Sequence, residues 1–105
     1  MREVILGHDG DSVVYSVPDE VANNLRKYCM DFCDKWIWND PNAKKYRIVD
    51  EDGEICVAYC AEDFIEYLND WVFPNQPSVF VKNLGWTECG RKLPLEYKNY
   101  PIFHF

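Results

Sequence analysis

The sequence lacks the short motifs that mark the common classes of enzyme and cofactor-binding domain. It holds no glycine-rich phosphate loop, no nucleophile elbow, no dinucleotide fingerprint and no zinc-protease helix. Histidine is scarce, and nothing in the sequence orders a site around His8 or His104. We therefore expect a protein that is not an enzyme, with no catalytic residue, cofactor or metal ion.

Long apolar runs are also missing, so we expect neither a transmembrane helix nor an N-terminal secretion signal. The five cysteines are an odd number and lack the spacing of a disulfide framework or of the short knuckles in structural zinc sites. Small buried hydrophobic residues are the simpler interpretation of these thiols. Together these absences predict a cytoplasmic protein with reduced cysteines.

Lysine and arginine are absent between residues 48 and 81. Eight acidic residues fall in the same stretch: Asp50, Glu51, Asp52, Glu54, Glu62, Asp63, Glu66 and Asp70. The 105-residue chain has a formal net charge of −7, and its few basic residues after residue 81 do not offset this region. Such a distribution argues against direct binding to nucleic acid or to an anionic membrane.

Residues 18–38 carry the clearest secondary-structure signal. Apolar side chains recur at intervals of three and four from Val21 to Trp36, which is the spacing of one helical face. Pro18 suits the first position of a helix, and Pro41 disfavours helical geometry in the residue before it. The pattern predicts one long amphipathic helix, about as long as a small domain is wide.

The two halves of the chain share a pattern at a constant shift of 43 positions: Ile5 matches Ile48, Gly10 matches Gly53, and Leu25 matches Leu68. We interpret this as a strand–turn–strand–helix (ββα) unit used twice, in residues 1–40 and 45–73, followed by a strand and an irregular tail in 78–105. Two unrelated hairpin–helix units with Asp-Gly turns would also look alike.

The predicted fold is a single α+β domain. We expect a two-layer sandwich, with a mainly antiparallel sheet of four or five strands and two helices on one face. Apolar residues occupy both faces of the predicted strands, so the pattern leaves open which face is buried.

Glu62, Glu66 and Asp70 are spaced at i, i+4 and i+8, which places them on one face of the second predicted helix. Like charges at this spacing destabilise a helix by about 0.2–0.5 kcal/mol per pair. A solvated face kept for solubility is one interpretation, and a docking strip for a basic partner is the other. The acidic turn before this helix lacks the distal ligands of a calcium loop. The predicted partner-binding residues are Asp50, Glu51, Asp52, Glu54, Glu62, Glu66 and Asp70.

These observations favour a non-enzymatic protein-binding module, such as an inhibitor, an immunity-type protein or an adaptor, that meets a basic protein surface. The alternative is a small-ligand or catalytic domain with a pocket lined by Cys29, Cys33, Trp36 and His8. The apolar residues 102–105 should either dock on the chain's own core or pair with another sheet edge. We thus expect a monomer, or a homodimer formed through this aromatic tail.

Overall fold

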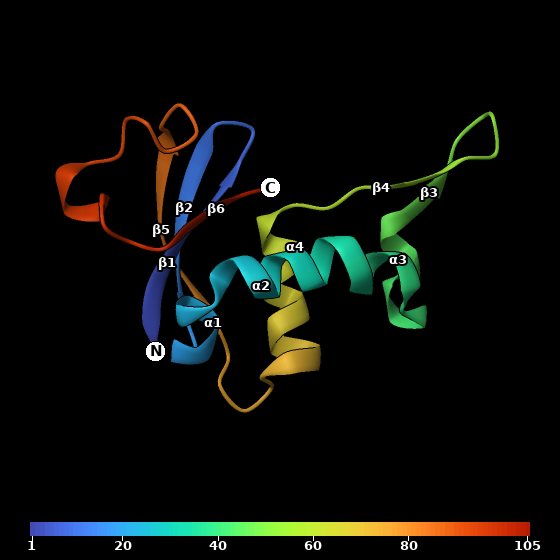
Figure 1. The fold of residues 1–105 in the computed structure, drawn as a ribbon, viewed down its shortest axis with the longest axis horizontal. Helices are drawn as coiled ribbons and strands as arrows, with labels where there is room; N and C mark the ends of the chain where they lie inside the picture. The colour runs from blue at the N-terminus through green and yellow to red at the C-terminus, as the bar shows by residue number, and fades with distance from the viewer.

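The computed structural model describes all 105 residues, which fold around a four-stranded mixed sheet with the strand order β5-β2-β1-β6 (Figure 1). Its strands are β1 (Arg2–His8), β2 (Asp11–Val17), β5 (Val79–Trp86) and β6 (Ile102–His104). Strand β2 lies antiparallel to β1 and β5, whereas β6 runs parallel to β1. The predicted α+β class, the N-terminal hairpin and a later strand at the sheet edge are confirmed.

The turn between β1 and β2 depends on two residues with positive φ. Asp9 has φ 52° and Gly10 has φ 89°, and the flanking pair is His8 with Asp11. Positive φ at both central positions fits the right-handed twist of a two-residue hairpin, and Asp-Gly is a favoured sequence for such a turn. This turn fixes the register of the hairpin and therefore decides which residues share a face.

The two faces of the sheet have different coverings. Leu6 and Tyr15 point toward the helices and belong to the main core. On the opposite face, the C-terminal segment covers the sheet, since the Thr87 hydroxyl bonds Ser12 at 2.6 Å and Tyr100 bonds Glu3 at 3.3 Å. The sheet thus carries helices on one side and irregular chain on the other, which the prediction of two layers did not include.

The predicted long helix forms as a series of helical segments rather than as one regular α-helix. It consists of α1 (Asp19–Asn23), α2 (Leu25–Met30), the π-helical segment η1 (Asp31–Trp36) and α3 (Ile37–Asn39). The first break falls at Asn24, with φ −134° and ψ 39°, where the side-chain amide donates to the Glu20 carbonyl at 3.1 Å. Asparagine favours such local bonds over helical ones, which explains the break.

The second predicted helix is confirmed as α4 (Ala61–Tyr67) continued by the π-helical segment η3 (Leu68–Val72). Asp63 caps its start, where one carboxylate oxygen accepts from the Cys60 backbone N–H at 2.8 Å. At its end, the Phe73 N–H donates to the Leu68 carbonyl at 2.7 Å, five residues back. The change from i+4 to i+5 bonding underwinds the last turn.

Strands β3 (Arg47–Val49) and β4 (Ile55–Val57) form a second, separate sheet, so the prediction that all strands share one sheet is wrong for this pair. The helical stretch from α1 to α3 carries the chain about 30 Å at 1.5 Å per residue, and the 3-10 helix η2 (Pro41–Tyr46) follows it. The second hairpin therefore begins far from the first and projects from the body (Figure 1). A duplicated unit stays a prediction, because the two halves share their local elements but not their place in a sheet.

Phe32, at the centre of the core, is fully buried. Its ring centroid lies 5.2–6.4 Å from those of six other aromatic residues: Trp36, Tyr46, Tyr59, Phe64, Tyr67 and Phe105. The C-terminal tail thus packs on the core of its own chain through Phe105. None of the helices combines the length and apolarity needed to cross a bilayer.

Candidate functional site

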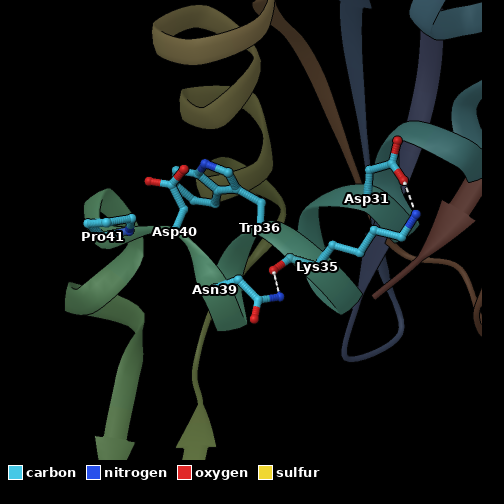
Figure 2. Close-up of a pocket in the computed structure, with 6 residues that line it drawn as sticks. All are labelled: Asp31, Lys35, Trp36, Asn39, Asp40 and Pro41. Carbon is cyan, nitrogen blue, oxygen red and sulfur yellow. Dashed lines mark hydrogen bonds and ion pairs between the residues drawn. The ribbon is translucent and has the colours of Figure 1, made fainter.

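The largest depressions on the surface are explained by local structure. One of about 340 Å³ lies beside the end of the helical stretch (Figure 2). Its charged and amide groups are already engaged, since Lys35 pairs with Asp31 at 3.4 Å and the Asn39 amide donates to the Lys35 carbonyl at 2.7 Å. Asp40 accepts from the Asn42 N–H at 2.8 Å and caps η2. These contacts hold the end of the helical stretch together, so we assign this depression a structural role.

A second depression, of about 350 Å³, lies between the start of β1 and residues 99–101. Two of its polar side chains, those of Arg2 and Glu3, are bonded within the chain. Arg2 donates to the Asn23 side chain, and Glu3 accepts from the Tyr100 hydroxyl. These contacts fasten the C-terminal segment and α1 to β1, so we assign this depression a structural role.

A third depression, of about 170 Å³, lies between the main sheet and the first turn of α4. Three strands contribute to it, because Asp11 of β2 is paired with His8 of β1, and Val13 of β2 is paired with Asn83 of β5. Directly opposed residues point to the same face, which here is the face turned toward the helices. Its lining residues are His8, Asp11, Val13, Tyr15, Cys60, Ala61, Glu62 and Asn83.

Two carboxylates in this depression, those of Asp11 and Glu62, have no hydrogen-bond or ion-pair partner in the chain. Two other polar side chains have partners: His8 lies 3.2 Å from Asp9, and the Asn83 side-chain oxygen accepts from the Gly85 N–H at 2.7 Å. Val13 and Ala61 supply apolar surface between them. We call this set the acidic depression: an apolar lining with two unpaired negative charges.

Tyr15 forms a rigid wall of the acidic depression. It is only 4% exposed, and its ring meets that of Phe80 edge-on at 6.1 Å. Burial, together with the negative charge of the nearby Glu62 carboxylate, raises the pKa of Tyr15 to about 12. The hydroxyl is therefore neutral at physiological pH and can donate or accept a hydrogen bond, but it cannot act as a base.

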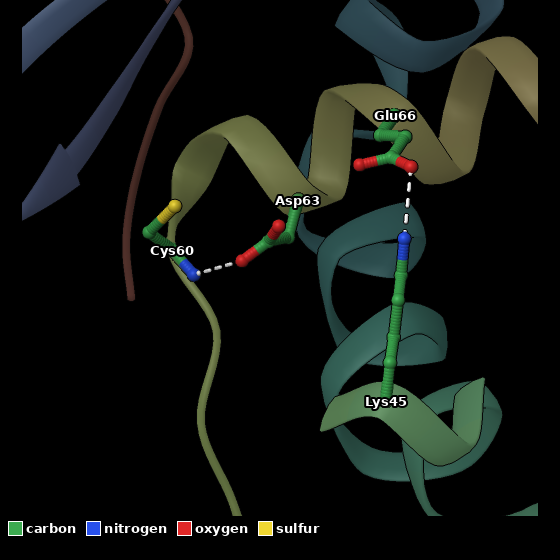
Figure 3. Close-up of polar contacts among 4 residues, drawn as sticks. All are labelled: Lys45, Cys60, Asp63 and Glu66. Carbon is green, nitrogen blue, oxygen red and sulfur yellow. Dashed lines mark hydrogen bonds and ion pairs between the residues drawn. The ribbon is translucent and has the colours of Figure 1, made fainter. Parts of the chain in front are cut away.

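Cys60 is the only cysteine that lines the acidic depression. Burial raises the pKa of its thiol, and the Asp63 carboxylate lies against its backbone (Figure 3). A reactive cysteine needs a lowered pKa and a nearby cation. The position of Cys60 at the start of α4 is thus better explained by helix capping than by nucleophilic chemistry.

The three carboxylates predicted to form a strip on α4 do not share one environment. Glu66 pairs with Lys45 of η2 at 2.9 Å, and this contact raises the pKa of the lysine (Figure 3). Glu62 and Asp70 remain exposed without a cation. Because the helix underwinds from Leu68, Asp70 does not continue the regular line from Glu62 to Glu66. The unpaired carboxylates therefore lie at the two ends of this helical stretch, Glu62 near its start and Asp70 near its end.

The acidic turn of the second hairpin lies apart from α4, at the tip of the projecting ribbon (Figure 1). Asp50 has a structural role there, because one carboxylate oxygen accepts from the backbone N–H groups of Asp52 and Glu54, each at 2.9 Å. Glu51, Asp52 and Glu54 are exposed and have no cation partner. The seven residues predicted from sequence thus form two surfaces rather than one.

The alternative pocket is not assembled. Cys29 is fully buried in the core, where desolvation raises the pKa of its thiol. Trp36 lines the depression beside α3, whereas His8 lines the acidic depression on the main sheet. Nowhere do three or more His, Cys, Asp or Glu side chains gather closely enough to hold a metal ion together.

The sequence points to Glu62 as a partner-binding residue and to His8 as part of the alternative pocket, but not to the other residues of the acidic depression. Alternation along β2 places Asp11, Val13 and Tyr15 on one face and could have grouped them. The contribution of Asn83 and Cys60 depends on how β5 and α4 pack, which no local pattern reveals. A comparison with family models, curated proteins and solved structures finds no match to this chain, so its function is inferred from this geometry.

Proposed function

We propose that the protein is a non-enzymatic binding module for a basic protein surface, and that one lysine or arginine side chain of the partner enters the acidic depression. The observation that carries this proposal is the pair of unpaired carboxylates, Asp11 and Glu62, beside an apolar lining. An incoming cation would gain two charge-assisted hydrogen bonds there, which are stronger than neutral ones.

The size and lining of the depression support a side chain rather than a metabolite. Its volume of about 170 Å³ falls below the range of roughly 300–1,000 Å³ typical of small-molecule sites. Lysine and arginine place an aliphatic stem on apolar surface and keep the charged end among polar groups. Val13 and Ala61 would contact the stem, and the carboxylates would contact the charged end.

The charge of the whole chain supports the same class of partner. A formal net charge of −7 attracts a basic protein before contact and raises the association rate. Asp70 in η3, the π-helical continuation of α4, would give a second, weaker contact. An inhibitor, an immunity-type protein or an adaptor would each use such a surface, and the hairpin tip lies too far from it to belong to the same contact (Figure 1).

The proposal is tested by affinity capture from a lysate of the source organism, with the immobilised chain as bait. The test variant D11N/E62Q removes both charges with little change in shape. The matched control D34N/E96Q removes two exposed carboxylates outside the depression, so both variants change the net charge equally. Captured proteins are identified by mass spectrometry, and the purified candidate is titrated against all three baits by calorimetry.

We expect a basic protein that binds the wild type and the control equally but binds D11N/E62Q at least tenfold more weakly. Loss of two charge-assisted bonds, each about 1.5–3 kcal/mol, accounts for such a change. Equal affinity for all three baits would exclude the depression as the contact, and the absence of any basic partner would contradict the proposed function.

A further inference from the structure

The second hairpin has two open edges, and of its two strands only Val57 packs against the core. Its role is independent of the acidic depression. We propose that β3 is an edge through which two copies of this chain pair, antiparallel across a two-fold axis, so that their hairpins form one four-stranded sheet β4-β3-β3-β4. An isolated two-stranded hairpin is only marginally stable in water, and three or more strands are normally needed.

The backbone of β3 presents free hydrogen-bonding groups on its outer edge. Tyr46 and Asp50 bond inward, to Ala58 and Glu54 respectively. In an antiparallel ladder the bonded pairs alternate, so the N–H and C=O of Val49 and the C=O of Arg47 point away from β4. The Arg47 N–H bonds the Lys44 carbonyl. If Val49 faces Arg47 of the second copy, each Val49 N–H meets a free carbonyl, which gives two symmetric hydrogen bonds.

This register also gives the apolar side chains of the ribbon a partner. Ile48 is 52% exposed and would lie opposite Ile48 of the second copy at the two-fold axis. Opposed residues between bonded pairs are the closest in an antiparallel sheet, so these two side chains would be in contact. Val49, 66% exposed on the other face, would lie along the aliphatic stem of the opposing Arg47.

The charges along the β3 edge are self-complementary. Lys44 stands at its base and is free of ion pairs, beside Lys45, which pairs with Glu66 of its own chain at 2.9 Å, and Glu51 and Asp52 stand at its tip. Antiparallel pairing about Ile48 brings each tip beside the base of the other copy, so opposite charges meet at both ends. The β4 edge has no such pattern, because acidic residues precede it and no cation follows it. Charge complementarity therefore selects β3, and it selects a second copy of this chain as the occupant.

The place of the hairpin allows this pairing. It projects from the body, and β3 rises to the tip on the side of the molecule farthest from the main sheet (Figure 1). The strand is only three residues long, so the contact is small and belongs with weak, transient interfaces. We expect association in the concentration range above micromolar, with fast exchange between monomer and dimer.

Sedimentation equilibrium, measured over a series of protein concentrations up to the millimolar range, tests the pairing. Variants with exchanged charges at the two ends of β3 test its register. The weight-average mass of the wild type should rise from 12.5 kDa toward twice that value. The variants K44E and D52K should each associate more weakly than the wild type, because like charges then meet at both ends. Lys45 is left unchanged because it binds Glu66. An equimolar mixture of the two variants should recover association, since opposite charges then meet at both ends of the mixed dimer.

A proline pair tests the backbone part of the proposal. V49P removes the outward N–H that would bond the second copy and should abolish association. I55P places a proline in β4, at the other edge of the hairpin, and should leave association unchanged. Circular dichroism confirms that each variant is folded. A wild type that stays monomeric over the whole range, charge variants that associate as well as the wild type, or a mixture that fails to associate would each overturn the proposal.

Discussion

Replacement of Phe32 by alanine should be among the most destabilising single changes in this chain. The side chain is fully buried, and six aromatic rings surround it. Truncation of a buried phenylalanine typically costs about 3–5 kcal/mol, which includes the cavity left behind. Aromatic pairs add roughly 0.5–1.5 kcal/mol each beyond the buried area. We therefore expect a loss near the upper end, about 4–5 kcal/mol.

This loss is large on the scale of a single domain, whose total stability is roughly 5–15 kcal/mol. Urea unfolding followed by tryptophan fluorescence and by far-ultraviolet circular dichroism measures it directly. With a denaturant slope of about 2 kcal/mol per molar, the midpoint should fall by about 2 M. If the variant is too unstable to show a folded baseline, F32L, which keeps most of the volume, gives a smaller shift in the same direction.

Phe80 provides the matched control, because it is also an aromatic residue in contact with the core but is 61% exposed. F80A should lower the free energy of unfolding by less than about 1 kcal/mol, within the usual range for exposed positions. A loss in F32A no greater than that in F80A would refute the aromatic cluster as the centre of the core.

Three further outcomes follow from the structure. T87V should lower the free energy of unfolding by about 1–3 kcal/mol in urea, because it leaves the buried Ser12 hydroxyl without its partner at 2.6 Å; an unchanged midpoint would contradict that bond. The thiol of Cys89 should react with a disulfide reagent in the native state and that of Cys29 only on unfolding, since Cys29 is buried and its pKa is raised. Because the Tyr15 pKa rises from 10.0 to about 12 on folding, its contribution to stability is complete below pH 10 and is lost as pH rises through 12. Y15F should therefore show a shallower alkaline loss of stability than the wild type, and parallel pH profiles would be inconsistent with a buried hydroxyl.

The elements of this fold follow from local patterns in the sequence. Spacing of three and four from Val21 to Trp36 predicts the helical stretch, and the Asp-Gly turns predict both hairpins. The interruption at Asn24 was not predicted, because apolar spacing does not report the bond from its side chain to the backbone.

The assembly of those elements could not be derived from the same patterns. The match between the two halves suggested one common sheet, yet β3 and β4 pair only with each other. Whether a strand joins the main sheet depends on where the preceding helix ends in space. The spacing of apolar residues does not determine that position. The exposure of Ile48, a match to the buried Ile5, shows the consequence: equal local sequence does not ensure equal burial.

The candidate site was predicted only in part. The charge pattern singles out Glu62 and treats Glu66 as equivalent to it, although Lys45 binds the Glu66 carboxylate. Asp11 lies far from the acidic stretch in sequence and joins Glu62 only through the packing of α4 beside β2. The residues of this site come from three strands and a helix, and only the tertiary fold brings them together. The pattern of a single sequence can indicate individual residues of such a site but not their grouping.

Recognition of a basic partner depends on the affinity of the acidic depression for a basic side chain, which NMR titration measures directly. Backbone amide shifts are followed as Nα-acetylarginine amide is added, with the isosteric but uncharged Nα-acetylcitrulline amide as the control ligand. We expect saturable shifts at Asp11, Glu62 and Asn83 with the arginine derivative alone, and their loss in D11N/E62Q. Equal responses to both ligands, or arginine-dependent shifts confined to other parts of the surface, would contradict the proposed recognition of a basic partner.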